Sequence, residues 1–547
     1  MKKNIVFRAL YTMLLLSSCM KSEYDLQQVD KSKLVLDPTI GAPLLYSPAM
    51  TVEQMLMRYL GGNKVGVYPD KLVYIRYENI HMDINASDAI TLPSPVNISP
   101  NQVIAYNDAG WSFSGSKSTI TKTVAYTFNF VNGEQVDSIV FNSLLYNITN
   151  LTSNYPVSGT GNTLTIEFPT LTKGGVPFST QIEITSGAFN TTRTVPLTDY
   201  TLGLTSNQFN VKYTLSLNGS LPTSGSLTIA HNFGSLSSTL DYRSIHGYIG
   251  SRILFSTTQT IPISLFDNAE NMTFEDPKVT MSISNSFGMP MSIGITNLSV
   301  LSSGGLTIPV NITGNGGQDS ILILNYPASV TDAPAVTSRT FDKNNSDIKN
   351  AMNAQPKRFT YRITAKANPA GKPSGPIRHF VKRDSKAEIN LDVIFPLWGS
   401  CLKYGVRDTF EFDYGGLEGN AKGIEFRVWV KNGLPAGGKL TLILLDANKN
   451  EVDRIASDMT ILSPAPYDNN GIATGITPHD FTLQYYHLEK LPQIKWAAID
   501  IGFHSPYVNG TDASGGVKTV KILSDNTMEI KVGVKVKFAY KIGGEGN

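Results

Sequence analysis

The sequence is poor in charged residues and has no long apolar run beyond its first twenty positions. Charged residues make up 16% of its 547 positions, against a usual share of about 25%. The 46 lysines and arginines nearly balance the 44 aspartates and glutamates, and the formal net charge is +2. Because so small a charge creates no strong field, it excludes electrostatic attraction to nucleic acid or to an anionic membrane surface.

Cysteine is almost absent, since the chain contains only Cys19 and Cys401. A disulfide framework of the kind that stabilises small secreted domains is therefore excluded, and stability must come from packed apolar cores. No histidine lies near Cys401 in the sequence. We therefore expect Cys401 to be a small buried side chain and not a catalytic thiol.

Motifs for catalysis, metal binding and phosphate binding are also lacking. None of the histidines forms an H-E-x-x-H motif or a cluster with cysteine, and there is no G-x-S-x-G nucleophile elbow. Gly110 and Gly115 have the spacing of a phosphate-binding loop, but Lys117 follows one position too late. The segment 446–451 lacks the sixth-position glycine and the final glutamate of a calcium loop, so it predicts a hairpin turn. We expect no catalytic residue, no metal site, no cofactor and no enzymatic activity.

The first eighteen residues have the pattern of an export signal. Lys2, Lys3 and Arg8 precede the apolar run 9–16, which is too short for a membrane span of about 20 residues. The segment then ends in Leu16, Ser17, Ser18 and Cys19. This ending resembles the lipobox of bacterial lipoproteins. The resemblance implies that residues 1–18 are a signal peptide, and that the Cys19 thiol carries a diacylglycerol anchor in the membrane.

Residues 19–33 are polar and unpatterned, as in a flexible tether. They resemble the tether of Bacteroidota lipoproteins, in which acidic residues after the acylated cysteine direct the protein to the outer surface. Here Glu23 and Asp25 are the only acidic residues, and Ser22 interrupts the run. The resemblance therefore favours a lipid-anchored protein of the outer membrane at the cell surface, with the periplasmic face as the open alternative.

Residues 34–110 predict a small mixed α+β module. Thr51 and Gln54 have the spacing of a capping box, apolar residues follow at helical spacing, and Gly61 ends the run. Several prolines within 93–100 indicate a linker.

Beyond residue 110 the apolar residues alternate with polar ones, which is typical of half-buried strands. Short strands separated by glycine, proline, asparagine and serine predict β-sandwich-like modules over 111–240, 241–384 and 385–547. A short helix is expected near Asn345. The predicted fold class is therefore mainly β, with several antiparallel sandwich-like modules in tandem after the small N-terminal module.

The last strand has a marked two-faced pattern. Its apolar face begins at Ile530, and its other face must stay in water. That wet face carries four lysines, namely Lys531, Lys535, Lys537 and Lys541. We expect these lysines to protect an exposed sheet edge against aggregation, and contact with an acidic partner is the alternative.

The segment 279–291 has the order strand, asparagine, loop, proline, strand. In this order it is similar to the β-sandwich domains of the late-embryogenesis-abundant or water-stress-hypersensitivity type. The resemblance implies that Asn285 caps the turn and that Pro290 begins the next strand. The proline that the family has directly after the asparagine is Ser286 here.

Together these features predict a non-catalytic outer-membrane lipoprotein that acts as a binding or scaffold subunit of an envelope complex. Outer-membrane protein assembly, secretion and uptake machineries all use such subunits, and an outer-membrane protein is the expected partner. The alternative is a surface glycan-binding lipoprotein of a polysaccharide-uptake system, with Trp429 and Trp111 as candidates for stacking on sugar rings. An enzyme whose site is assembled from distant segments is the third alternative.

Overall fold

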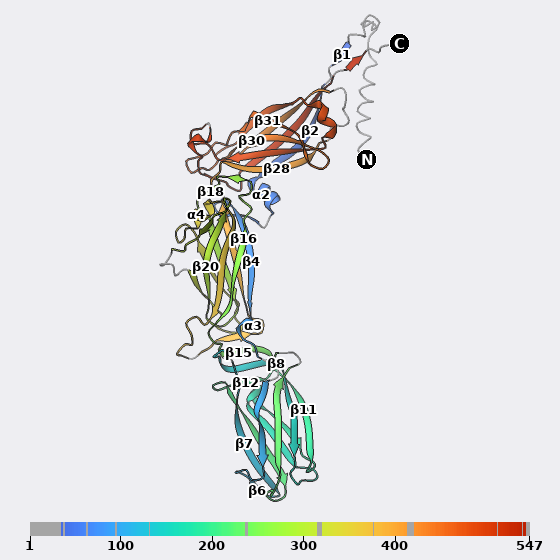
Figure 1. Ribbon diagram of the computed structural model, residues 1–547, viewed down its shortest axis with the longest axis vertical. Helices are drawn as coiled ribbons and strands as arrows, with labels where there is room; N and C mark the ends of the chain where they lie inside the picture. Colours follow the sequence, from blue (N-terminus) through green and yellow to red (C-terminus); the bar gives the residue numbers. More distant parts are fainter. Residues whose placement is uncertain are drawn as a thin grey trace. The chain divides into compact units, whose positions relative to one another are not determined.

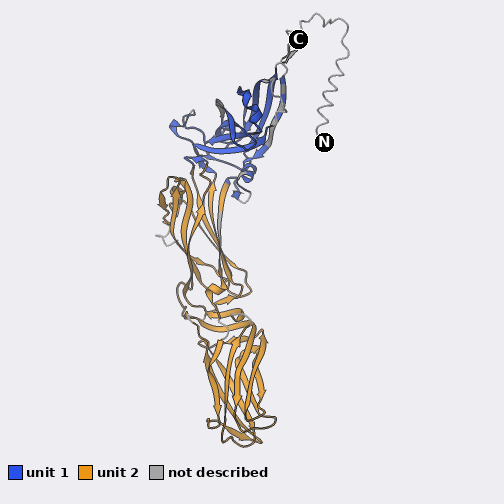
Figure 2. Ribbon diagram, turned by 45° about the vertical axis from the view of Figure 1, so that its right-hand side comes forward, with its two compact units in different colours: residues 1–73, 268–272, 397–547 blue, residues 74–267, 273–396 orange. Residues whose placement is uncertain are grey.

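The computed structural model is mainly β and contains several separate antiparallel sheets (Figure 1), which confirms the predicted fold class. It describes residues 34–36, 39–61, 64–92, 96–130, 132–235, 239–313, 320–375, 377–412, 421–510, 512–538 and 540–542. The predicted signal peptide, lipobox (Leu16, Ser17, Ser18), Cys19 and tether lie outside these residues. The chain divides into two compact units (Figure 2): unit 1 comprises 1–73, 268–272 and 397–547, and unit 2 comprises 74–267 and 273–396.

Unit 1 is built on two antiparallel sheets. Apolar side chains at alternate positions of their strands form one core, with Phe426, Val428, Leu440 and Leu442 among its buried members. The first sheet has the order β2 (Thr39–Thr51), β35 (Thr527–Phe538), β29 (Ala421–Asn432), β32 (Thr477–Tyr485). The second has the order β17 (Ala269–Glu270), β28 (Lys403–Glu411), β33 (Trp496–His504), β30 (Gly437–Leu445), β31 (Glu451–Leu462). Smaller pairs join β1 (Leu34–Leu36) to β36 (Tyr540–Ile542) and β27 (Trp398–Ser400) to β34 (Val520–Lys521).

The predicted helix is α2 (Val52–Leu60), which directly follows β2 and precedes β3 (Val65–Val67). The backbone N–H of Gln54 donates to Thr51 Oγ1 over 3.2 Å, and the backbone N–H of Thr51 donates to Gln54 Oε1 over 3.0 Å. At the other end Gly61 has φ 96°, and its N–H donates to the Met57 carbonyl. The capping box and the glycine stop are therefore both confirmed.

The segment 34–110 does not form a sheet of its own. Its three long strands join three different sheets: β2 pairs with β35, β4 (Val73–Asn85) with β26 (Lys386–Pro396), and β5 (Val96–Ala105) with β14 (Ser226–Gly234). Alternation in the sequence shows which face of a strand is buried, but it does not show which strand lies beside it. The sequence of 34–110 therefore predicted a separate module, whereas in the structure each of its three long strands belongs to a different sheet.

Unit 2 contains one large sheet of long, bent strands. Strand β8 (Gln135–Ser153) pairs with β15 (Asp241–Tyr248) along its first half and with β11 (Phe189–Thr198) along its second. The remaining strands of this sheet are β6 (Ser112–Ser114), β7 (Lys117–Thr127), β9 (Thr163–Lys173), β10 (Val176–Glu183), β12 (Thr201–Gly203), β13 (Gln208–Asn218) and β25 (Phe380–Lys382), together with β5 and β14.

The core beneath this sheet holds a buried histidine. The hydroxyl of Tyr146 lies 2.9 Å from His231 Nδ1, and the hydroxyl of Tyr213 lies 2.8 Å from His231 Nε2. Tyr126 extends the network through a 2.7 Å contact with the Tyr213 hydroxyl. Burial lowers the pKa of His231 to about 3, so the ring is neutral and offers one donor and one acceptor to the two tyrosines.

The rest of unit 2 contains two further sheets. In the first, β20 (Met291–Ser302) lies beside β24 (Pro356–Ala367), and in the second, β19 (Lys278–Asn285) lies beside β26. The first sheet also contains β16 (Arg252–Pro262), β21 (Thr307–Pro309) and β22 (Ile321–Leu324), and the second also contains β23 (Ala335–Phe341) and β4. Two short helices are α3 (Ala86–Ala89) and α4 (Ile348–Asn353), of which the second confirms the helix expected near residue 345.

The turn after β19 has the predicted local geometry. The buried Asn285 accepts a hydrogen bond from the Phe287 N–H through Oδ1 over 3.0 Å, and its Nδ2 donates to the Asn325 carbonyl over 2.9 Å. Pro290 directly precedes β20, which belongs to the other sheet. The turn is confirmed, while the resemblance to late-embryogenesis-abundant domains stays a prediction.

Candidate functional site

The lysine-rich strand β35 lies inside its sheet and not at its edge. It pairs with β2 on one side and with β29 on the other, and the edges of the sheet are β2 and β32. The expectation that its lysines protect an exposed edge is therefore wrong, because both rows of β35 backbone groups already have partners.

The lysines belong to a charged outer face of this sheet. Residues such as Phe426 and Val428 of β29 point into the core, so their neighbours in the strand point outward. We call this outer surface the lysine face and define it by nine residues: Glu425, Arg427, Trp429 and Lys431 of β29, Asp480 of β32, and Glu529, Lys531, Lys535 and Lys537 of β35.

Each glutamate of the lysine face is shared by two lysines. Glu425 lies 2.6 Å from Lys537 Nζ and 3.6 Å from Lys535 Nζ. Glu529 is placed in the same way, 2.9 Å from Lys531 Nζ and 3.4 Å from Lys431 Nζ.

The third carboxylate, that of Asp480, is bound by the Arg427 guanidinium through two hydrogen bonds of 3.0 and 2.6 Å. The nine residues therefore contain five cations and three carboxylates, which leaves a surplus of two positive charges.

The carboxylates of the lysine face remain ionised far into acid. The hydrogen bond from Lys537 lowers the pKa of Glu425 to about 2. A hydrogen bond from Lys531 lowers the pKa of Glu529, and the bond from Arg427 lowers the pKa of Asp480. The cations of the face thus stabilise the charged form of all three carboxylates.

A groove of about 1080 Å³ crosses the lysine face. Its floor lies at Gly41 and Pro43 of β2 and Gly533 of β35, which have short side chains or none. Its rim includes Arg427, Lys531 and Lys535. A shallow hollow with cations around it is suited to an anionic group.

Trp429 is partly exposed beside the groove. The ammonium groups of Lys431 and Lys531 lie 4.8 and 4.5 Å from the centroid of its ring. These are cation–π distances, so the ring already contacts two cations. The glycan-stacking role of this residue stays a prediction.

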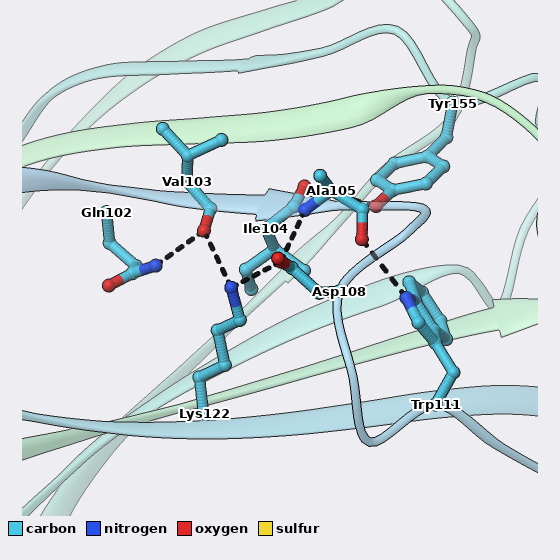
Figure 3. A network of polar contacts seen from close by, with 8 residues as sticks. All are labelled: Gln102, Val103, Ile104, Ala105, Asp108, Trp111, Lys122 and Tyr155. Carbon is cyan, nitrogen blue, oxygen red and sulfur yellow. Dashed lines mark hydrogen bonds and ion pairs between the residues drawn. The ribbon is translucent and has the colours of Figure 1, made fainter.

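Trp111, the other stacking candidate, is held in a loop of unit 2 (Figure 3). Its Nε1–H donates to the Ala105 carbonyl over 3.1 Å, and its ring meets Tyr155 edge to face with centroids 6.0 Å apart. Asp108 accepts from the Ala105 N–H over 2.7 Å and forms an ion pair with Lys122. These contacts give Trp111 a role in fixing the loop, and its glycan role also stays a prediction.

Two further sequence expectations concern Cys401 and residues 446–451. Cys401 is only partly buried, and its Sγ lies 2.9 Å from the Lys403 carbonyl. Burial raises the pKa of the thiol to about 11, so the thiol is protonated at neutral pH.

The segment 446–451 forms a turn between β30 and β31. Asp446 Oδ1 accepts hydrogen bonds from the N–H groups of Asn448 and Asn450, each over 2.8 Å. The predicted hairpin turn is therefore confirmed.

Two absences concern only the part of the chain that the structure describes. In that part no group of three or more histidine, cysteine, aspartate or glutamate residues is arranged to hold a metal ion. In the same residues no helix is long and apolar enough to cross a membrane.

The chain was compared with known proteins. No family model and no curated protein matches it. Among solved structures, a protein of Parabacteroides distasonis that is inferred to be secreted is 9% identical, with 91% of this chain and 99% of the other covered and a TM-score of 0.26. A structure of infectious bursal disease virus is 10% identical, with 81% and 82% covered and a TM-score of 0.13. Such low TM-scores establish no shared fold, so the site is interpreted from its own residues.

Proposed function

We propose that this protein is a non-catalytic, lipid-anchored binding protein of the outer membrane that holds an acidic partner protein on its lysine face. The observation that carries this proposal is the position of Lys531, Lys535 and Lys537 on the solvent side of an inner strand. At that position they protect no edge, and together with Arg427 and Lys431 they outnumber the three carboxylates of the lysine face by two.

The composition of the face supports a protein partner. Neighbouring like charges on a sheet are unfavourable, and here each pair of lysines shares one carboxylate. A partner that brings additional carboxylates would neutralise the surplus and gain electrostatic complementarity. Arg427 and Trp429, in the middle of the face, are of the residue types that dominate binding energy at protein interfaces.

The proposal is tested by purifying the full chain from its membrane in mild detergent through an affinity tag at its C-terminus. We expect an acidic protein to co-purify at about 0.05 M salt and to be released as the salt rises to about 0.5 M, because the charges of an exposed interface are screened. Recovery of the chain alone at every salt concentration would contradict the proposal.

The lipid anchor is a separate part of the proposal, and it depends on Cys19. We expect Cys19→Ser to move the protein from the membrane to the soluble fraction, because the serine hydroxyl cannot replace the thiol that carries the diacylglycerol. Cys401→Ser is the matched control and should leave the protein in the membrane fraction. Fractionation followed by immunoblotting measures both variants, and membrane retention of the Cys19 variant would contradict lipidation at this residue.

A further inference from the structure

We infer that the groove of the lysine face binds an extended acidic segment of the partner, in which one carboxylate enters the hollow above Gly533. This inference rests on the proposed function, and it adds the conformation and the charge spacing of the segment that is bound.

The first argument is the missing side chain in the middle of the lysine row. Alternate residues of β35 point outward, so the outer row reads Lys531, Gly533, Lys535, Lys537. Gly533 therefore leaves a gap between two lysines. In the register of the sheet it lies opposite Pro43 of β2 and Arg427 of β29.

The gap continues onto the neighbouring strand. Gly41 of β2 lies opposite Lys535, and a Cβ atom added to Gly41 would have only the Val534 carbonyl oxygen within 4 Å, at 3.8 Å. The floor of the groove is therefore open space above backbone, and the hollow is large enough for a side-chain carboxylate.

The second argument is the charge around the gap. Arg427, Lys531 and Lys535 all line the groove. Each of them already contacts a carboxylate of the lysine face, and two of these carboxylates, Glu425 and Asp480, also line the groove. An incoming carboxylate would thus join an existing ion-pair network and take up part of its positive surplus.

The third argument is the spacing of the cations. A strand rises by about 3.3 Å per residue, so the backbone positions of Lys531 and Lys535 are about 13 Å apart, and those of Lys535 and Lys537 about 7 Å apart. An extended peptide has the same rise. Acidic residues at relative positions 1, 3, 5 and 7 of such a peptide lie on one face. Those at 1, 5 and 7 match the three lysines, and the one at 3 enters the hollow above Gly533. Consecutive acidic residues point to alternate sides.

The inference is tested with two synthetic peptides of the same composition and the full-length chain. The first carries glutamates at positions 1, 3, 5 and 7 among serine and threonine, and the second carries the four glutamates consecutively. Fluorescence anisotropy at low salt measures the affinity of each labelled peptide. We expect the spaced peptide to bind about tenfold more tightly, because all four of its carboxylates reach cations of the lysine face at once.

The variant Gly41→Leu fills the floor and leaves every charge of the lysine face in place. We expect it to weaken binding of the spaced peptide about tenfold, because the hollow is closed. The matched control is Gly405→Leu in β28 of the other sheet, where an added Cβ atom has only the Asn268 carbonyl oxygen within 4 Å, at 3.9 Å, and the residue does not line the groove. Arg427→Gln, which leaves β2 unchanged, is a second probe of the groove and should also weaken binding.

The outcomes separate the inference from the proposed function. In one outcome, Gly41→Leu and Arg427→Gln both bind the spaced peptide as tightly as the wild type, and reversal of the lysine charges abolishes binding. This outcome overturns the groove inference, and the lysine face remains a binding surface. If reversal of the lysine charges also leaves binding unchanged, both the groove inference and the proposed function are overturned. If oligogalacturonate binds more tightly than either peptide, the inference of an acidic peptide segment is overturned, and an acidic glycan is the ligand of the groove.

Discussion

Simultaneous replacement of Lys531, Lys535 and Lys537 by glutamate is expected to weaken partner binding by about 100-fold or more. The change turns five cations and three carboxylates into two cations and six carboxylates, so the lysine face repels the ligand that it should attract. Like charges brought together at an interface cost several kcal/mol, and each 1.4 kcal/mol corresponds to about tenfold in affinity. The measurement is recovery of the partner in the affinity purification, quantified against the wild type.

A control triple variant separates the local face from the overall charge. Lys173, Lys357 and Lys372 are exposed lysines of unit 2, and their replacement by glutamate changes the net charge by the same amount. We expect this variant to retain the partner. Equal loss in both variants would show that the overall charge, and not the lysine face, controls binding. In the test variant Glu425 loses both of its lysines and Glu529 loses one of its two. The unfolding transition of this variant is therefore recorded together with the binding data.

The same binding has an expected pH dependence with a definite sign. The pKa of Glu425 lies at about 2, so this carboxylate stays ionised between pH 7 and about pH 3. Ordinary aspartate and glutamate side chains of a partner protonate near pH 4. Binding should therefore fall as the pH drops below about 5, through loss of the partner's charge.

The second large expected effect concerns the stability of unit 2 in mild acid. His231 has a pKa of about 3 in the folded state, against about 6.5 for a histidine in an unfolded chain. Between these values the unfolded chain binds one proton more than the folded chain. The stabilisation is fully present above pH 6.5 and is lost as the pH falls toward 3, by about 1.4 kcal/mol per pH unit.

The experiment compares the wild type with His231→Phe by denaturant unfolding at pH 6.5, 5.5 and 4.5. The phenylalanine leaves the buried Tyr146 hydroxyl without its partner, which costs about 1–3 kcal/mol, whereas the Tyr213 hydroxyl keeps its contact with Tyr126. We expect the stability difference between the two proteins to shrink as the pH falls, because only the wild type has the titrating imidazole. Tyr146→Phe removes one hydrogen bond and keeps the imidazole, so its pH slope should equal that of the wild type. A constant difference for His231→Phe would contradict the argument.

The features that were predictable from the sequence are local ones. The capping box of α2, the Asp446 hairpin turn and the Asn285 turn each depend on residues within a few positions of one another. Their hydrogen bonds are specified by side-chain type and spacing, which can be recognised without knowledge of the rest of the chain.

The carboxylates of the lysine face could not be predicted in this way. Glu425, Asp480 and Glu529 come from three strands, and their neighbours are set by the pairing of β29 with β32 and β35. The alternation of β29 places Glu425 on a polar face, but nothing in its sequence identifies the two lysines that share it.

The sequence by itself determined the strand periodicity and the positions of α2 and α4, and it predicts a lipobox with the candidate anchor Cys19. Only the tertiary structure decided that β35 is an inner strand, because its partner β2 comes from the other end of the chain. Strand pairing is made by backbone hydrogen bonds that almost any residue can form, so neighbours distant in sequence leave little trace in it. From the sequence, the lysines of the last strand were therefore expected to protect a sheet edge. In the folded protein they lie on an inner strand and form a candidate binding surface.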